Sequence, residues 1–458
     1  MKITIKKLRY CPILVAMFVV SANTAIAQNI IYNNDNYSEW SIIRNYKTKI
    51  DICYNVGYLS NSFYYVDRTT NIIRSFPLNG EISVYDFVIV GDTVFFCGGC
   101  FSNQVSQGCF GFFIIPDLFF SGGSITYYPI NIPNSISPYY SLISGLGNMT
   151  VTMPPSGDLH IVMVGGSYTY NPNVHFQNTH YFMAGAIVDA QRNALGEYSI
   201  TYTIDSDYTY LYNDIVATDN YIVVSATGTS DQSHNIFYYK HPAVAGDSYF
   251  DPLLLTPPIA TVPFQTASTS IVNVQSGNIY LTKMEYDGFA AVCLSQDNNG
   301  INTTVVSVYD NPVNQPIMRF IIPPDICCQD IVYNPSQKSL YIIPTLRNVM
   351  YRTDMPFVYN SRIETDNYRW LSIDNADNDK REIISGYNHS DFKKKYWLYD
   401  IQDQNGCINY SETNNIFVET NEASNTFNQR VVEDTVFLME ITRDIEKLNL
   451  DVICGQAK

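Results

Sequence analysis

Apolar residues occur along this chain in short runs that are joined by polar turns. Residues 84–96 (VYDFVIVGDTVFF) are two apolar runs joined by Gly91 and Asp92, and looser copies occupy residues 213–224 and 329–335. Two short apolar runs around a polar turn predict a β-hairpin. The copies predict that the same hairpin opens several units of one repetitive fold.

The hairpin recurs at a nearly regular interval. Aligned copies open, 56 to 66 residues apart, at Asp86, Asn148, Asp214, Ser270 and Asp330. Two more strands follow each hairpin's first strand, and a looser fourth strand closes the unit, for example at residues 124–130, 197–204 and 301–309. Four short antiparallel strands are the unit of a β-propeller blade. The repeat therefore predicts an all-β fold that consists of one β-propeller. The chain length divided by the mean interval predicts seven blades, with six or eight as alternatives.

The ends of the chain fit the repeat less closely. No Pro-, Ser- or Gly-rich linker divides the chain, so we expect residues 28–458 to form one domain. Residues 442–450 are the best helical candidate, but they are short and we expect a strand there. Because an open ring leaves strand edges unpaired, we expect both termini to close it. In this hypothesis residues 37–43 join the sheet made by residues 431–453.

The first 27 residues have the three parts of a signal peptide. Lys2, Lys6, Lys7 and Arg9 precede an apolar stretch at residues 11–22, and Ala25-Ile-Ala27 supplies a small-x-small cleavage site. The apolar stretch is too short to span a bilayer, and no later segment is long enough. We therefore expect cleavage after Ala27 and export to the periplasm or the outside of the cell, with no membrane span.

Composition supports strands and excludes two classes of partner. The chain contains 37 Tyr and 24 Phe, and aromatic residues favour strands. Without the signal peptide, 23 Lys and Arg face 43 Asp and Glu, a formal charge of −20. Such a charge repels nucleic acid and anionic lipid, so we expect neither as a partner.

Nine cysteines remain after cleavage, so at least one is unpaired in a monomer. Cys97 and Cys100 have the spacing of a redox motif, but a strand is the wrong context for a reactive thiolate. We predict a Cys100–Cys109 disulfide across a hairpin loop. A second candidate, Cys53–Cys454, would link the first and last units.

No motif for a metal, a cofactor or a known catalytic centre is found. The spacing of the six histidines fits no metal site, and we expect them on surface loops. Residues 374–379 (DNADND) lack the glycine and the distal Glu of a calcium loop, so we expect a solvated hairpin there. We predict no cofactor, no metal and no assigned catalytic residue.

Two units end their second strand in a double glycine, at residues 95–99 (FFCGG) and 161–166 (IVMVGG). This resembles the strand-end diglycine of kelch-type blades, although the Tyr and Trp that follow it in kelch repeats are missing. The repeated hairpin as a whole resembles uncharacterised exported β-propeller proteins of Gram-negative gut bacteria. That resemblance implies a fold and a compartment, and no activity.

Asp86, Asp214 and Asp330 are the candidate site residues. In a propeller they would lie at the mouth of the central channel, where they could bind a ligand. Alternatively, each could accept hydrogen bonds from backbone N–H groups and lock neighbouring blades together, which repetition at equivalent positions favours. We predict a non-enzymatic protein that binds a glycan, peptide or protein partner through face loops. The alternative is a glycoside hydrolase or lyase that uses these carboxylates.

Overall fold

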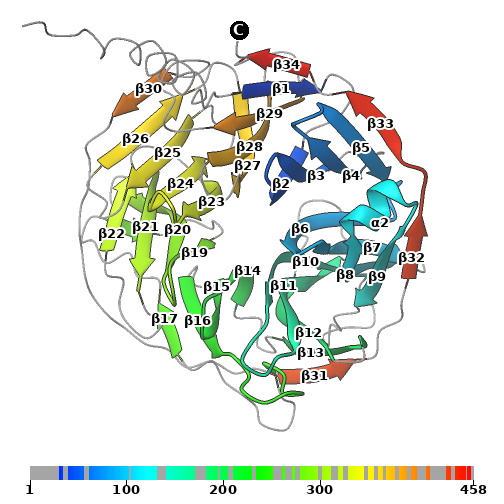
Figure 1. Ribbon diagram of the computed structural model, residues 1–458. Helices are drawn as coiled ribbons and strands as arrows, with labels where there is room; N and C mark the ends of the chain where they lie inside the picture. The colour runs from blue at the N-terminus through cyan, green and yellow to red at the C-terminus, as the bar shows by residue number, and fades with distance from the viewer. Residues whose placement is uncertain are drawn as a thin grey trace, which may run out of the picture.

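The computed structural model describes most of the chain between residues 30 and 454. The described residues are 30–34, 40–55, 61–102, 105–130, 141–170, 182–193, 196–204, 210–228, 234–250, 260–263, 271–273, 279–297, 302–310, 318–322, 328–344, 349–354, 359–364, 368–376, 381–388, 394–399, 409–412, 430–434, 439–449 and 451–454. They form an all-β fold of small sheets set around a common centre, as in a propeller (Figure 1). The predicted signal peptide lies outside the described residues.

Each sheet starts with a strand near the centre and continues outward through antiparallel neighbours. The first sheet contains β2 (Trp40–Lys47), β3 (Ile50–Asn55), β4 (Ser62–Asp67), β5 (Ile72–Pro77) and β33 (Glu446–Asn449). The next part of the chain forms a ten-stranded sheet that divides into two groups of five. A parallel pair between Ile143 and Ser106 joins the two groups.

The two groups of the ten-stranded sheet have the same order of strands. One contains β6 (Ile82–Val90), β7 (Thr93–Ser102), β8 (Val105–Ile114), β9 (Ser124–Ile130) and β32 (Met439–Thr442), and the other contains β10 (Ser141–Thr152), β11 (Leu159–Tyr170), β12 (Phe182–Arg192), β13 (Tyr198–Ile204) and β31 (Arg430–Asp434). A short helix, α2 (Ile115–Phe120), connects β8 to β9. In both groups the fifth strand comes from the C-terminal part of the chain.

Four further sheets complete the arrangement. The middle of the chain forms the first two of them. These contain β14 (Tyr210–Ala217), β15 (Tyr221–Gly228), β16 (His234–Lys240) and β17 (Ala260–Pro263), and then β18 (Ile271–Asn273), β19 (Tyr280–Lys283), β20 (Phe289–Asp297), β21 (Asn302–Tyr309) and β22 (Met318–Ile322). The other two contain β23 (Cys328–Asn334), β24 (Ser339–Pro344), β25 (Val349–Asp354), β26 (Tyr359–Glu364) and β30 (Asn409–Glu412), and then β27 (Tyr368–Ala376), β28 (Arg381–Asn388), β29 (Lys394–Tyr399), β1 (Ile30–Asn34) and β34 (Asp451–Cys454).

The continuous apolar runs are explained by burial on both faces of a sheet. In β7, Val94 and Phe96 belong to a hydrophobic cluster shared with the first sheet. The alternate residues Phe95 and Cys97 belong to the cluster on the opposite face, shared with β10 to β13. Successive side chains of a strand point to opposite faces, so a strand packed between two sheets needs apolar residues at nearly every position.

The double glycines allow a close approach between neighbouring strands. A Cβ atom on Gly98 would lie 1.9 Å from the carbonyl oxygen of Ser83, and one on Gly165 would lie 2.1 Å from that of Gly145. In both cases the opposing strand shifts its register at the next residues, which brings its backbone toward the glycine. The diglycine therefore has a local steric cause here.

The unit that follows β17 begins later than the repeat predicted. Ser270 lies outside the described residues, and the strand that opens the unit toward the centre is β19. As a result the described part of residues 301–309, which were predicted to be a fourth strand, forms β21 (Asn302–Tyr309), and this strand lies between β20 and β22 in the sheet. The alignment was wrong here because the segment before β19 contains another short apolar run, β18.

The predicted pairing of the chain ends is wrong in detail. Of the predicted segment 37–43, the described residues 40–43 belong to β2, whose sheet contains β33 but not β31, β32 or β34. Instead β2 pairs with β3 through a tight turn in which Lys49 has a positive φ of 62°. The C-terminal strands are four or five residues long, and they lie separately on β13, β9, β5 and β1. Residues 442–449, the described part of the segment 442–450, contain strand and no helix, as predicted.

Candidate functional site

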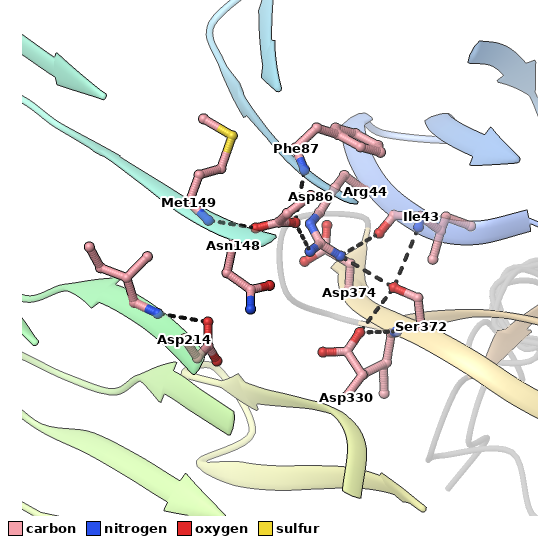
Figure 2. Close-up of polar contacts among 12 residues, drawn as sticks. Ile43, Arg44, Asp86, Phe87, Asn148, Met149, Asp214, Asp330, Ser372 and Asp374 are labelled. Carbon is pink, nitrogen blue, oxygen red and sulfur yellow. Dashed lines mark hydrogen bonds and ion pairs between the residues drawn. The ribbon is translucent and has the colours of Figure 1, made fainter. Parts of the chain in front are cut away.

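The inner strands surround a cavity of about 460 Å³. Its lining includes Asp86, Asp214 and Asp330, the three carboxylates that the repeat aligned, and also Asn148. They come from four different inner strands, β6, β14, β23 and β10. The structure therefore brings the predicted residues into one cavity, as Figure 2 shows.

A β-bulge precedes each of the three carboxylates. The register with the neighbouring strand shifts between Val84 and Asp86 in β6, between Tyr212 and Asp214 in β14, and between Cys328 and Asp330 in β23. A bulge bends its strand and changes the direction of nearby side chains. The repeated sequence thus encodes a backbone irregularity together with the acidic residue that follows it.

Each carboxylate joins two neighbouring inner strands through backbone hydrogen bonds. One oxygen, Oδ1, accepts the N–H of the residue that follows, at 2.8 Å in all three cases. The other, Oδ2, accepts an N–H of the next inner strand, from Met149 at 3.1 Å for Asp86, from Leu281 at 2.6 Å for Asp214, and from Ile373 at 3.0 Å for Asp330. This is the arrangement expected of residues that lock sheets together.

Arg44 is a member of the site that the sequence analysis missed. Its guanidinium lies 3.0 Å from Oδ1 of Asp86, and it also donates to Oγ of Ser372 at 3.3 Å and to the carbonyl oxygen of Ile43 at 2.9 Å (Figure 2). It therefore connects β2 with β6 on one side and with β27 on the other. The sequence feature that could have identified it is a single charged residue directly after the apolar pair Ile42-Ile43.

Asp374 is the second residue that was missed, and its predicted place in a solvated hairpin is wrong. It lies in β27, lines the cavity, and accepts the backbone N–H of Asn45 at 2.7 Å. Its strand has the same bulge, between Trp370 and Ser372, as the three aligned strands. The acidic run in the sequence hid it, because the pattern placed the whole run in a turn, whereas its first three residues, 374–376, belong to β27.

Burial raises the pKa of every carboxyl group in the cavity. The pKa of Asp214 rises to about 8, because burial outweighs its two backbone hydrogen bonds and the nearby Asp86 and Asp330 add repulsion. The pKa of Asp374 rises to about 6 through burial, against the opposing effect of the Arg44 charge. Burial also raises the pKa of Asp86 and Asp330, with Arg44 again opposing it. The Arg44 charge lowers the pKa of the other three carboxyl groups, but it is not among the causes that act on Asp214.

Tyr85 places an aromatic ring at the cavity. It is the bulged residue before Asp86, it lines the cavity, and half of its surface is exposed. A Cβ atom on Gly145 would lie 3.2 Å from the Tyr85 ring, and one on Gly99 would lie 3.4 Å from the Tyr85 hydroxyl oxygen. Glycine at these two positions therefore leaves room for the ring, a feature that the repeat pattern did not predict.

The cysteine predictions have different outcomes. Cys53 is a buried free thiol in β3, whereas Cys454 is in β34 of another sheet, so the predicted Cys53–Cys454 bridge is not formed. Cys100 and Cys109 are also free thiols, but they lie on the paired strands β7 and β8 and share a hydrogen bond. That hydrogen bond lowers the pKa of Cys100, while burial raises the pKa of Cys109.

We expect the mature protein to form the Cys100–Cys109 disulfide in an oxidising compartment, with the Cys100 thiolate as the attacking group. Peptide mass spectrometry after alkylation should find these two cysteines linked and Cys97 alkylated. Removing the link with C100S should lower the free energy of unfolding by about 2 kcal/mol, whereas reduction should not affect C100S. Alkylation of both thiols in oxidised protein would contradict the pairing.

Two histidines are buried, contrary to the expectation of surface loops. His160 has no exposed surface, and its Nδ1 lies 3.0 Å from Oδ1 of Asp189 in the same sheet. His241 is nearly as buried, and its Nε2 lies 3.0 Å from the carbonyl oxygen of Thr218. Polar partners within the fold make these positions possible. His175 and His180 lie outside the described residues.

The described residues contain neither a candidate metal cluster nor a candidate membrane-spanning helix. In that part of the chain, no group of three or more His, Cys, Asp and Glu is placed to hold a metal ion. Within the same residues, no helix is long and apolar enough to cross a membrane.

The sequence matches no family model and no curated protein. Among solved structures, dihydro-heme d1 dehydrogenase NirN in complex with DHE is 10% identical, with a TM-score of 0.32, over 84% of this chain and 75% of that one. Two structures of the extracellular domain of BT4673 from B. thetaiotaomicron are 9% and 8% identical, with TM-scores of 0.18 and 0.17. They cover 90% and 81% of this chain and 86% and 82% of those chains. TM-scores this low carry no argument about function.

Proposed function

We propose that this chain is an exported seven-bladed β-propeller that binds a glycan, peptide or protein partner and performs no reaction on it. Seven blades result when the two groups of the ten-stranded sheet count separately. The innermost strands of the blades are then β2, β6, β10, β14, β19, β23 and β27. The sheet of β27 contains both β1 and β34, which supports closure by the two ends of the chain.

A side-chain link at every junction supports a closed ring. Asp86, Asp214 and Asp330 provide three links, and Arg44 provides a fourth, from β2 to β6. The remaining links run from Nδ2 of Asn148 to the carbonyl oxygen of Asn213, from the N–H of Tyr333 to Oγ1 of Thr282 at 3.2 Å, and from the N–H of Asn45 to Asp374. Each inner strand is thereby connected to the next one around the ring.

The sequence of residues 1–27 supports export. Their basic start, short apolar stretch and Ala25-Ile-Ala27 site fit a signal peptide. The rest of the chain, residues 28–458, then constitutes the propeller domain in the periplasm or outside the cell. The high negative charge of this part fits a soluble exported protein.

The observation that carries the binding function is the central cavity with its prearranged lining. A volume of about 460 Å³ is within the usual range for small-ligand sites. The carboxylates are fixed by backbone N–H groups, and the half-exposed ring of Tyr85 offers a contact surface of the kind that saccharides and peptide side chains use. The oxygens of the three aligned carboxylates already accept hydrogen bonds, which favours recognition over catalysis.

The runner-up function is a glycoside hydrolase or lyase, and one observation favours it. Four carboxyl groups line one cavity, and a pKa of about 8 keeps Asp214 protonated near neutral pH. A general acid in glycoside cleavage needs such a raised pKa. Against this role, both oxygens of Asp214 accept backbone N–H groups, which leaves less freedom to protonate a leaving group.

Binding can be tested with the mature protein on glycan and peptide arrays, followed by titration of the best probe. We expect Y85A to weaken binding of that probe about tenfold or more, because it removes an aromatic contact in the cavity. The matched control is Y286A, which removes a tyrosine that is 78% exposed on the turn between β19 and β20. Equal loss in both variants would contradict binding in the cavity. Release of reducing ends from a polysaccharide by wild type, abolished in D214N, would favour the enzyme.

A further inference from the structure

The last four strands of the chain form an outer layer, the C-terminal strap, which consists of β31, β32, β33 and β34. Figure 1 shows them in orange and red along the rim of the ring. Each pairs antiparallel with the outermost strand of a different blade, in the order β13, β9, β5 and β1. The strap therefore runs around the ring in the direction opposite to that of the preceding chain.

Pairing along the strap is backbone pairing of short segments. β32 aligns Met439 to Thr442 with four residues of β9, and β33 aligns Glu446 to Asn449 with four residues of β5. Side chains add polar contacts between Glu440 and Ser124 and between Arg443 and Glu81. The last two side chains are 33% and 41% exposed, so their ion pair adds little stability.

One strap residue reaches the interior. Ile441 is 1% exposed and belongs to the hydrophobic cluster between the first two blades, where the half-buried Ile445 packs beside it. Its neighbours in β32, Met439, Glu440 and Thr442, are exposed. Among the strap residues whose side chains are described, Ile441 is the single member of a buried cluster.

The ring beneath the strap has a different basis of stability. Its hydrophobic clusters are formed between blades by strands such as β4, β7 and β8, with aromatic contacts among Phe63, Phe96 and Phe113. The inner strands are linked by the buried hydrogen bonds described above. Opening β32 and β33 breaks two ladders of four residues each. Among the side chains described in this segment, it withdraws Ile441 and the half-buried Ile445 from the cluster, while it leaves the contacts between blades intact. Segments with few buried apolar contacts open locally at lower free energy than the core does.

We propose that the C-terminal strap is a releasable clasp: β32 and β33 open together, with Ile441 as their anchor, while the ring remains folded. Release uncovers the edges of β5 and β9, which are unpaired backbone groups able to accept another extended segment. The strap is thus a conformational device that covers these edges in the resting protein, and the ring beneath it retains its central cavity in both states.

Hydrogen exchange of the full mature chain, followed by mass spectrometry, tests the clasp. We expect I441S to accelerate exchange at least tenfold in β32, β33, β5 and β9, because a serine in the apolar cluster weakens the anchor. Exchange in β6, β14 and β23 should stay at its wild-type rate. The matched control is M439S, which changes an exposed residue of the same strand and should leave all rates unchanged.

Three results would overturn the clasp. Faster exchange of the inner strands in I441S, in parallel with β32, would mean that the strap opens with global unfolding. Acceleration of β32 without β33 would mean that the strands do not act together. If I441S does not fold, hydrogen exchange of the wild-type protein in low urea takes the place of the variant. In that experiment, exchange of the inner strands as fast as that of β32 and β33 would exclude a separate opening of the strap.

Discussion

Replacing Asp330 with Ala is expected to lower the free energy of unfolding by at least about 2 kcal/mol. The substitution removes the acceptor for the N–H groups of Ile331 and Ile373 and for the hydroxyl of Ser372. Each buried polar group left without a partner costs about 1–3 kcal/mol. The loss should appear in urea unfolding as a lower midpoint with an unchanged slope, because the surface that unfolding exposes is the same.

Two control variants separate the hydrogen bonds from the charge. D330N keeps one carbonyl acceptor in place and should be destabilised less than D330A. D219A removes a carboxylate whose side chain is 51% exposed and paired with Lys283, and it should change stability by less than about 1 kcal/mol. If D330A unfolds at the wild-type midpoint and instead loses turnover of a polysaccharide, the carboxylates are an active site and the binding proposal is wrong.

Stability is expected to fall as the pH rises from about 4 toward about 8. The pKa of Asp214 is about 8 in the folded protein and about 3.8 when the chain is unfolded. Between these values the folded state holds a proton that the unfolded state has released, so unfolding becomes easier as the pH rises. One such proton corresponds to about 1.4 kcal/mol per pH unit. Asp86, Asp330 and Asp374, whose pKa values are also raised, add to the same trend.

The contribution of Asp214 is measured as the difference between wild type and D214N. Urea unfolding between about pH 5 and about pH 8 should show a shallower decline for D214N, because asparagine does not titrate in this range. The difference in slope should be largest near about pH 6, midway between the unfolded and folded pKa values of Asp214. Parallel curves would show that Asp214 is ionised in the folded protein and that burial does not raise its pKa. D219N is the control, since its carboxylate is exposed.

The repeated hairpin was readable from the sequence because its contacts are local. In β14 and β15 the paired residues are close in sequence and a short turn joins them, so the apolar runs and the turn carry the whole signal. The predicted all-β fold and its small antiparallel sheets follow from that pattern. So does the presence of Asp86, Asp214 and Asp330 on inner strands, although each lies within its strand and not at the first residue, where the repeat predicted it. Burial of these strands on both faces explains why their apolar runs are unbroken.

Features that depend on contacts across the ring were not readable. Arg44 meets Asp86 from a different blade, and Asp374 accepts the N–H of Asn45, which is more than 300 residues earlier in the chain. Neither residue has a repeat partner of its own chemical type, so alignment of the units could not find them. Their shared surroundings are created only when the blades close around one cavity.

By itself the sequence determined the strands, their hairpins, the repeated acidic position and the diglycines, because each rests on alternation or on a steric need between neighbouring strands. The tertiary structure alone decided three things: which residue opens the unit of β19, which charges share the cavity, and where the C-terminal strands lie. The strap shows the reason most clearly. Its strands are four or five residues long, and each pairs with an edge that the local sequence does not specify. Edges of similar strands offer nearly equal backbone partners, so the choice among them depends on where the closed ring places each edge along the path of the chain.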